Sequence, residues 1–187
     1  MINLRDDRGS MGDSVTTIIA IFIAAILMFL FPLLAISERH EDIAQLATQE
    51  AVIEFVNKIS TSGLIKSSEY DMFMQRLAST GNKYEIEIEI QHLDENQGKK
   101  VGITSNDLIG ENVRYSTFTT AIFENEIFLE NGAYPLKKGD IVYVTVKNTN
   151  QTIAQQLRGF FYSVTGQGTY QIGASYSSMV VNNGVID

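Results

Sequence analysis

Side chains that commonly carry chemistry are scarce in this chain. It has two histidines and no cysteine, which excludes disulfides and thiolate metal sites. His40-Glu41 matches the start of the H-E-x-x-H zinc motif, but Ala44 stands where the second histidine is required. We therefore expect His40 to be solvated or interfacial rather than a zinc ligand. His92 follows an expected strand, so we expect it in a strand-end turn.

A row of three glutamates is the most regular polar pattern. Glu85, Glu87 and Glu89 alternate with isoleucines between Lys83 and Gln91, which predicts a strand with the glutamates on one face. Residues on one face of a strand lie about 6.5–7 Å apart, too far for three carboxylates to share one ion without other ligands. We expect a solvated face, or a surface that meets basic groups on a partner.

Other patterns of catalytic or cofactor sites are incomplete. Gly166 and Gly168 lack the third glycine of a dinucleotide-binding loop and precede an expected strand. No G-x-S-x-G elbow or S-x-x-K arrangement stands out among the serines. The net charge of −8 argues against nucleic acid, because phosphate binding relies on clustered lysine and arginine. The sequence predicts a protein that is not an enzyme, with no catalytic residue, cofactor, metal or nucleic-acid partner.

The N-terminal part of the chain contains a long apolar run, Ser14–Ile36, without an ionisable side chain. About 20 such residues cross the hydrocarbon core of a bilayer as a helix, and one central charge would cost about 2.5–3.5 kcal/mol. The run exceeds the apolar core of a signal peptide. The sequence predicts a transmembrane helix over residues 14–37 after a short leader or cytoplasmic segment, residues 1–13. Pro32 predicts a kink near Met28.

The orientation follows from the flanking bases. Arg5 and Arg8 precede the apolar run and Arg39 follows it, which favours a cytoplasmic N-terminus. The rest of this sequence contains no second run long enough to span. We therefore expect a single-pass protein of the cell membrane with its C-terminal head outside.

The helical pattern continues beyond the membrane run. From Glu38 to Ile59 there is no glycine or proline, and apolar residues recur at helical spacing. These residues are Ile43, Leu46, Ala47, Ile53, Val56 and Ile59. We expect an amphipathic stalk helix over residues 38–62, continuous with the membrane helix and giving a total length of about 65 Å. Gly63 supplies a C-terminal cap.

Residues 63–187 are predicted to form an extracytoplasmic α+β head. A second helix should be capped by Ser67 or Ser68 and bury Tyr70, Phe73, Met74 and Leu77, with Met72 also in the core. A third is expected at Thr152–Tyr162. Strands are expected at Lys83–Gln91, Ser116–Phe123, Glu126–Leu129 and Ile141–Lys147, and within Thr169–Val181, with polar turns at Asp94–Gly98 and Leu136–Asp140. The predicted fold is an antiparallel β-sheet packed on helices.

An apolar N-terminal helix that continues as a stalk into a β-rich head resembles the type IV pilins and pseudopilins. The charged leader resembles that of the tight-adherence minor pilins of the TadE type, in which an Arg-Gly pair precedes an acidic residue and the membrane helix. By this resemblance Arg8-Gly9 would end the leader, with cleavage after Gly9. Asp13 would take the part of the acidic residue that meets a neighbouring subunit's N-terminus. The family usually has glutamate five residues after the glycine, where this chain has Ser14.

The resemblance implies a pilin-like structural subunit of a bacterial surface filament or secretion apparatus. Its partners would be the bilayer and other pilin-like subunits, in a homo- or hetero-oligomer formed through the N-terminal helix. Ala20, Ala24 and Ala25 offer small residues for close helix approach, and Pro32 resembles the helix-softening proline of many pilins. The alternative is a permanently membrane-anchored extracytoplasmic binding or sensory module.

Overall fold

The computed structural model describes the backbone of residues 7–94, 114–162 and 171–186. It describes side chains within this part of the chain except those of residues 7–11 and 160–162. The predicted polar turn after Asp94 and the glycines at 166 and 168 lie outside the described residues.

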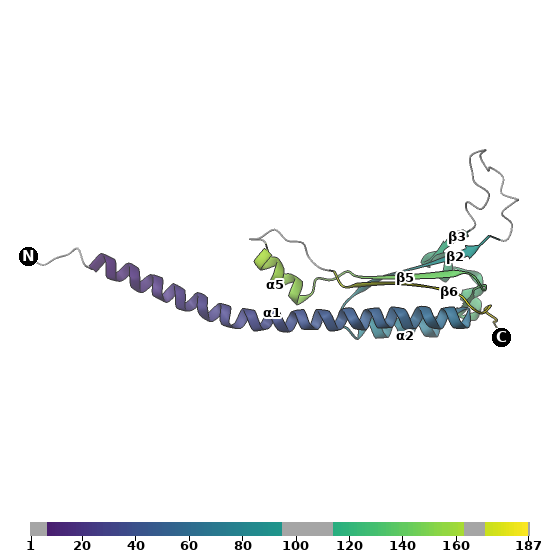
Figure 1. Ribbon diagram of the computed structural model, residues 1–187, viewed down its shortest axis with the longest axis horizontal. Helices are drawn as coiled ribbons and strands as arrows, with labels where there is room; N and C mark the ends of the chain where they lie inside the picture. The colour runs from purple at the N-terminus through teal and green to yellow at the C-terminus, as the bar shows by residue number, and fades with distance from the viewer. Residues whose placement is uncertain (1–6, 95–113, 163–170, 187) are drawn as a thin grey trace, which may run out of the picture. The chain divides into compact units, whose positions relative to one another are not determined.

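The chain divides into two compact units. The N-terminal unit consists of residues 1–42 and 153–169, and the head unit of residues 43–152 and 170–187. One long helix, α1 (Asp7–Ser62), contributes residues to both units (Figure 1). The predicted α+β class is confirmed, because this long apolar helix is followed by antiparallel sheets.

Helix α1 has no break between its apolar part and the expected stalk. It begins at Asp7, seven residues before the apolar run, and includes Pro32. The kink predicted near Met28 stays a prediction. At the other end Gly63 has a φ of 71°, and its amide donates to Ile59 O at 2.8 Å. A left-handed residue after the last turn is a common helix ending, and glycine adopts that conformation without strain.

The head unit contains two antiparallel sheets. The larger has the order β3-β2-β5-β6. Its strands are β2 (Tyr84–Leu93), β3 (Arg114–Phe118), β5 (Ile141–Asn148) and β6 (Gly173–Met179). The smaller pairs β1 (Leu64–Lys66) with β4 (Ala133–Pro135). The strands predicted at Lys83–Gln91 and Ile141–Lys147 are therefore confirmed, and the segment after Thr169 forms a single strand.

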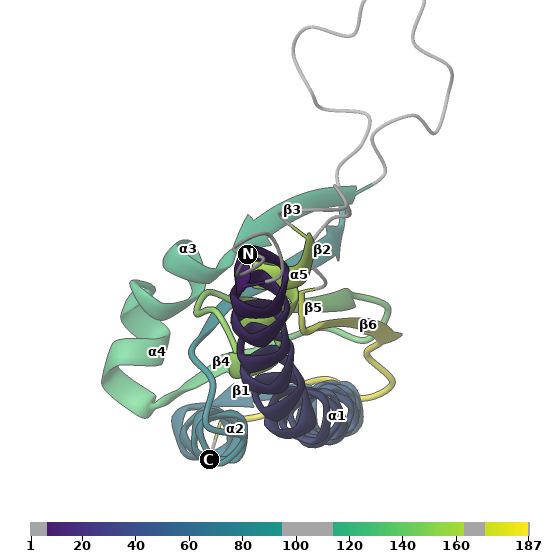
Figure 2. The ribbon, with the colours of Figure 1, turned by 90° about the vertical axis from the view of Figure 1, so that its left-hand side faces the viewer.

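Residues 43–62 of α1 and helix α2 (Ser67–Ala78) lie side by side on one face of the larger sheet (Figure 2). The rings of Phe55 and Phe73 stack between the two helices, with centroids 4.4 Å apart. The sheet contributes the apolar residues that alternate along its central strands, as the two-residue period predicts. The fully buried strand residues are Ile88, Ile90, Val142, Val144 and Val146.

Polar side chains also connect α1 to the sheet. Gln45 Nε2 donates to Gly173 O at 2.6 Å and Gln45 Oε1 accepts from Gly173 N at 3.0 Å. Ser60 Oγ donates to Met179 O at 2.7 Å. Both strand residues belong to β6, an edge strand, whose free backbone groups would otherwise need water or another chain. These bonds fix the helix along the length of that strand.

Two predicted strands are wrong in part or in full. The segment Ser116–Phe123 is strand only to Phe118, and helix α3 (Thr119–Phe123) follows. Thr119 Oγ1 accepts from Ile88 N at 2.7 Å and donates to Ile88 O at 3.3 Å. One side chain thus satisfies both backbone groups of a β2 residue, and the strand pairing ends there.

The segment Glu126–Leu129 is helical and belongs to α4 (Glu126–Asn131). Asn125 caps this helix, because its side-chain oxygen accepts from Ile127 N at 3.0 Å. Gly132 closes it in a left-handed conformation with φ 65°. These start and stop signals are stronger than the β-propensity of the few residues between them.

The second predicted helix is present as α2, with two corrections. Its N-cap is Lys66, which makes no side-chain capping bond, and not Ser67 or Ser68. Met72 and Met74 are exposed rather than in the core. Phe73 and Leu77 are the buried residues of α2, and Tyr70 packs partly buried against the same core. The third predicted helix is confirmed as α5 (Ile153–Tyr162) and belongs to the N-terminal unit.

Candidate functional site

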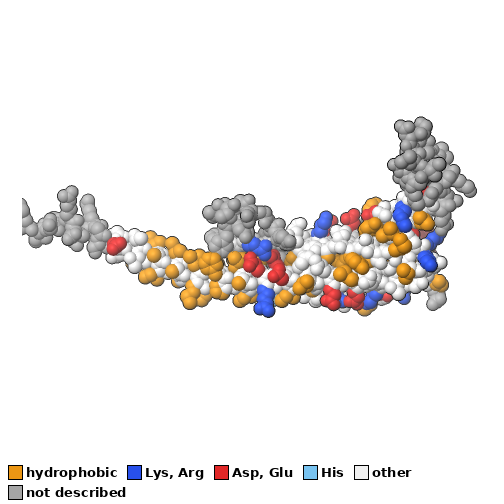
Figure 3. All heavy atoms as spheres, viewed as in Figure 1, with side chains coloured by type: hydrophobic (Ala, Val, Ile, Leu, Met, Phe, Trp, Pro, Cys, Tyr) orange, Lys and Arg blue, Asp and Glu red, His pale blue; other side chains and the backbone are white. Residues whose placement is uncertain are grey.

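An extensive exposed apolar surface lies on the N-terminal part of α1. No side chain from Gly12 to Ile36 is buried, and Phe29 is 76 % exposed. Apolar side chains cover this stretch in the space-filling view (Figure 3). Among the described residues, α1 is the one helix long and apolar enough to cross a membrane by length and composition. Exposed apolar area of this extent marks a surface that meets lipid or protein.

The small residues expected to pack in this surface lie on it. Ala20, Ala24 and Ala25 are exposed, and so is Pro32. Successive helix residues are about 100° apart, so Ala20 and Ala24 share one face while Ala25 lies on another. The alanines therefore offer close approach on two faces of α1.

The residues expected to act at the leader all fall in the first turns of α1. Arg8 and Gly9 have helical backbone, and their side chains are outside the described set. Asp13 is exposed, and its backbone carbonyl accepts from Thr17 Oγ1 at 2.8 Å. Leader cleavage after Gly9 and a role for Asp13 in assembly stay predictions.

A second exposed apolar surface lies on α1 within the head unit, and sequence reasoning missed it. The periodicity predicts one apolar face containing Ile43, Leu46 and Ile53 together with Val56 and Ile59. In the structure the last two are buried in the core, whereas the first three are exposed, Leu46 by 65 %. We call Ile43, Leu46 and Ile53 the outer stripe.

The outer stripe follows a regular spacing. Its members are three and seven residues apart, which places them along one side of a helix. The buried side of the same helix is made by Ala44, Thr48, Ala51, Val52, Phe55, Val56 and Ile59. Two apolar sides on one helix indicate two packing partners, and the described residues of the head supply only one. The spacing of Ile43, Leu46 and Ile53, read separately from the buried set, is the signal that would have revealed it.

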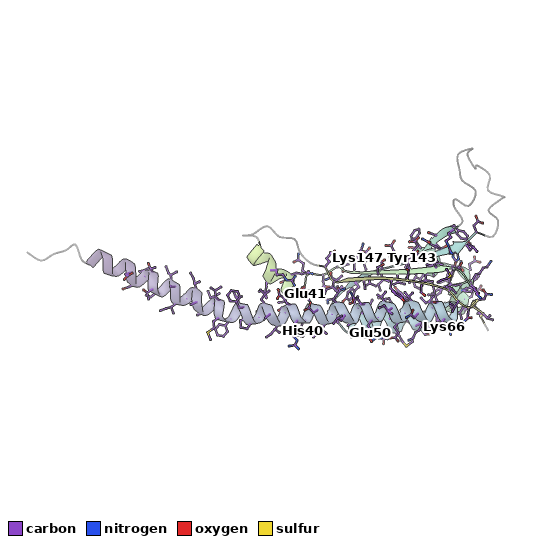
Figure 4. All side chains as sticks on the ribbon, in the orientation of Figure 1. His40, Glu41, Glu50, Lys66, Tyr143 and Lys147 are labelled. Atoms are coloured by element: carbon purple, nitrogen blue, oxygen red, sulfur yellow. The ribbon has the colours of Figure 1, made fainter. Side chains whose placement is uncertain are left out.

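The N-terminal unit contains a charged contact between α1 and α5. The guanidinium of Arg158 pairs with Glu41 through Nη2, and its Nε lies 3.6 Å from Glu38 Oε1. The Arg158 and Glu41 side chains are mostly buried, with 19 % and 11 % exposed. Figure 4 shows Glu41 on the α5 side of α1 and His40 on the opposite side. The expectation of a solvated His40 fits its exposed position.

His92 lies within β2 and is not in a strand-end turn. Its Nδ1 is 3.0 Å from Asp140 Oδ2, and Asp140 is only 1 % exposed. Asp140 also accepts from the backbone amides of Lys137, at 2.9 Å, and Leu93, at 3.4 Å. The two backbone amides and the His92 ring together hold this buried carboxylate and fix the turn before β5.

The same residues border a recess of about 310 Å³ in the head. It is lined by His92, Leu93, Asp94, Tyr115, Thr117, Tyr134, Pro135, Lys137 and Asp140. The His92 ring lies 5.0 Å from that of Tyr115 and 6.4 Å from that of Tyr134. Burial, with additional effects of Tyr115 and Asp140, raises the pKa of the Tyr134 hydroxyl. The recess can therefore hold a small polar or aromatic group beside the neutral phenol of Tyr134.

The glutamate row of β2 faces away from the core, as predicted. Glu85 pairs in register with Lys147 of β5, and Glu89 Oε1 accepts from Ser116 Oγ at 2.6 Å. Tyr143 and Lys147 lie on β5, away from α1 (Figure 4). Within the described part of the chain there is no group of three or more His, Cys, Asp or Glu side chains that could hold a metal ion.

No protein-family model, curated protein or solved structure matches this chain.

Proposed function

We propose that this chain is a pilin-like structural subunit, a minor pilin or pseudopilin, that assembles with other subunits through α1. The apolar part of α1 first holds the subunit in the cell membrane, with the N-terminus cytoplasmic and the head outside. On assembly the lipid-facing surface becomes a surface between subunits. Neither step requires catalysis by the head.

The outer stripe is the observation that carries this proposal. Leu46 is ten residues beyond Ile36, which corresponds to about 15 Å of helix. The headgroup layer on each side of a bilayer is only about 5–8 Å thick. Leu46 and Ile53 are therefore too far along α1 to be covered by lipid, yet they are exposed and apolar. A neighbouring α1 would cover both the apolar run and the outer stripe.

A membrane-anchored binding module is the second candidate, and the recess beside His92 favours it. Such a module would use α1 only as an anchor and the head to capture a small polar or aromatic ligand. It leaves the outer stripe without a role. We therefore prefer assembly through α1.

Mass spectrometry of the protein from fractionated cells tests the proposal. A mature N-terminus at Ser10 in the membrane or surface fraction supports a processed, pilin-like subunit. A terminus upstream of Gly9 in the membrane fraction contradicts processing and favours the static anchor. A soluble form that begins near Glu38 contradicts both candidates, because the apolar run would then be a removed signal sequence.

A further inference from the structure

Among the described residues, helix α5 is the one element outside α1 that belongs to the N-terminal unit. Its sequence, IAQQLRGFFY, has a single residue that is charged at neutral pH, Arg158. That charge is neutralised by Glu41 and Glu38. The first residue of the helix, Ile153, is 64 % exposed. A helix whose one charged side chain is paired is thus held beside the residues that directly follow the apolar run.

The pairing of Arg158 fixes the depth of α5 in a membrane. Glu38 and Glu41 are two and five residues beyond Ile36, which corresponds to about 3 Å and 8 Å of helix. With the apolar run in the hydrocarbon core, both carboxylates lie in the headgroup layer, which is about 5–8 Å thick. From its contact with α1, α5 points obliquely toward the N-terminal end of α1 and away from the axis of that helix (Figure 1). Its last turns therefore approach the hydrocarbon boundary.

We infer that α5 is an interfacial helix, which lies in the headgroup layer of the bilayer and contacts lipid directly. The Arg158–Glu41 pair acts as the positioning element, because it neutralises the charges and sets the depth. Helices of this kind place apolar side chains at the boundary between headgroups and acyl chains. The sequence of the last turn also contains Phe160, Phe161 and Tyr162, and aromatic residues are enriched at this level of the membrane.

This inference rests on the membrane-anchoring part of the proposed function and not on assembly. It adds a second lipid contact to the single span. It also gives the subunit a defined rotation about α1, because only one side of the helix carries α5.

Fluorescence quenching by brominated lipid tests the inference in the full-length chain. The chain has no native cysteine, so a single Gly159→Cys variant carries one environment-sensitive probe. A Cβ at this position meets no atom within 4 Å, so the substitution fits. The matched control is Leu129→Cys on α4, an exposed position of the head unit. Both variants are reconstituted into phosphatidylcholine vesicles with and without bromine on the upper acyl chain.

The expected result is a blue shift and loss of emission from the probe at position 159 with brominated lipid, and neither change for the control. Adding Arg158→Gln should reduce this quenching while the chain still floats with the vesicles. Unquenched emission from a floating Gly159→Cys variant overturns the inference, and a blue shift without quenching shows that protein covers α5 instead. Unchanged quenching with Arg158→Gln contradicts the positioning role of Arg158. A chain that fails to float overturns membrane anchoring itself, which is a distinguishable outcome.

Discussion

The two parts of α1 differ in where their apolar side chains lie. In the head unit, one side of residues 43–62 is buried against α2 and the larger sheet, with Val52, Val56 and Ile59 fully covered. In the N-terminal unit, no residue from Gly12 to Ile36 is buried. The same secondary structure thus serves as a core helix in one part and as an open apolar surface in the other. The first part is stabilised by the chain itself, and the second needs lipid or other subunits.

The largest expected effect is a loss of head stability, which should differ between the buried and the exposed side of α1. Phe55→Ala removes a ring that is 3 % exposed and stacked on Phe73, and such changes cost about 3–5 kcal/mol. The control Ile53→Ala truncates an exposed neighbour and should cost far less. Urea unfolding of the full chain in detergent, followed by circular dichroism, measures both. Equal losses would contradict the assignment of buried and exposed sides.

The next prediction concerns the apolar run. Phe22→Arg places a charge near its centre and should reduce membrane insertion by about 2.5–3.5 kcal/mol. The urea midpoint of the head should not change, because Phe22 belongs to the N-terminal unit. Alkaline extraction of membranes measures insertion, with Phe22→Leu as the control. Full retention of the arginine variant would show that this stretch is not the anchor.

The outer stripe gives a third, smaller effect. Leu46→Asp should weaken contact between subunits by about 1.5–3 kcal/mol, the value of burying one leucine, and leave the head folded. Leu129→Asp is a closely matched control, because Leu129 is 69 % exposed and Leu46 is 65 % exposed. Chemical cross-linking in membranes measures the oligomer. If both variants cross-link like the parent, the stripe is not an interface.

The smallest expected effect is the loss of stability when the exposed ion pairs of Glu54 with Lys58 and Arg76 are removed. Hydrogen bonds from Lys58 and Arg76 hold the pKa of the Glu54 carboxyl below its usual value. The carboxylate is 44 % exposed, so screening limits its contribution to about 0.2–1 kcal/mol.

Because the pKa of Glu54 is lower in the folded state, its contribution to stability is present above the unfolded value, ~4.3. It is lost as the pH falls through the folded value. Glu54→Gln should therefore lower the urea midpoint slightly at neutral pH and make no difference in strong acid. If the difference in urea midpoint between Glu54→Gln and the parent grows as the pH falls, the pKa of Glu54 is not lowered in the folded state.

Sequence patterns predicted the helices and strands that carry a regular apolar period over many consecutive residues. The uninterrupted stretch after Glu38 indicated a continuous helix, and the alternation from Tyr84 to Ile90 indicated β2 with its buried face. Short elements such as α4 were missed. This helix depends on its N-cap, Asn125, and its C-cap, Gly132, rather than on periodicity.

The candidate sites were harder to predict, because they depend on which elements meet. His92 and Asp140 lie 48 residues apart in sequence, and Glu41 and Arg158 lie 117 apart. Nothing local in the sequence indicates either pair. Similarly, periodicity placed Leu46 and Val56 in one apolar set, but only tertiary packing decides which side of α1 the head covers.

Disulfide cross-linking along α1 tests the central claim, that the apolar part of this helix joins subunits. The double variant Ala20→Cys/Ala25→Cys places two thiols about 140° apart on the helix, at exposed positions of a chain with no native cysteine. Each single variant can form no more than a dimer. Oxidation of the double variant in membranes of producing cells should give a ladder of multimers larger than dimers, because each assembled helix contacts more than one neighbour. Monomers and dimers alone would contradict assembly and show that α1 is only an anchor.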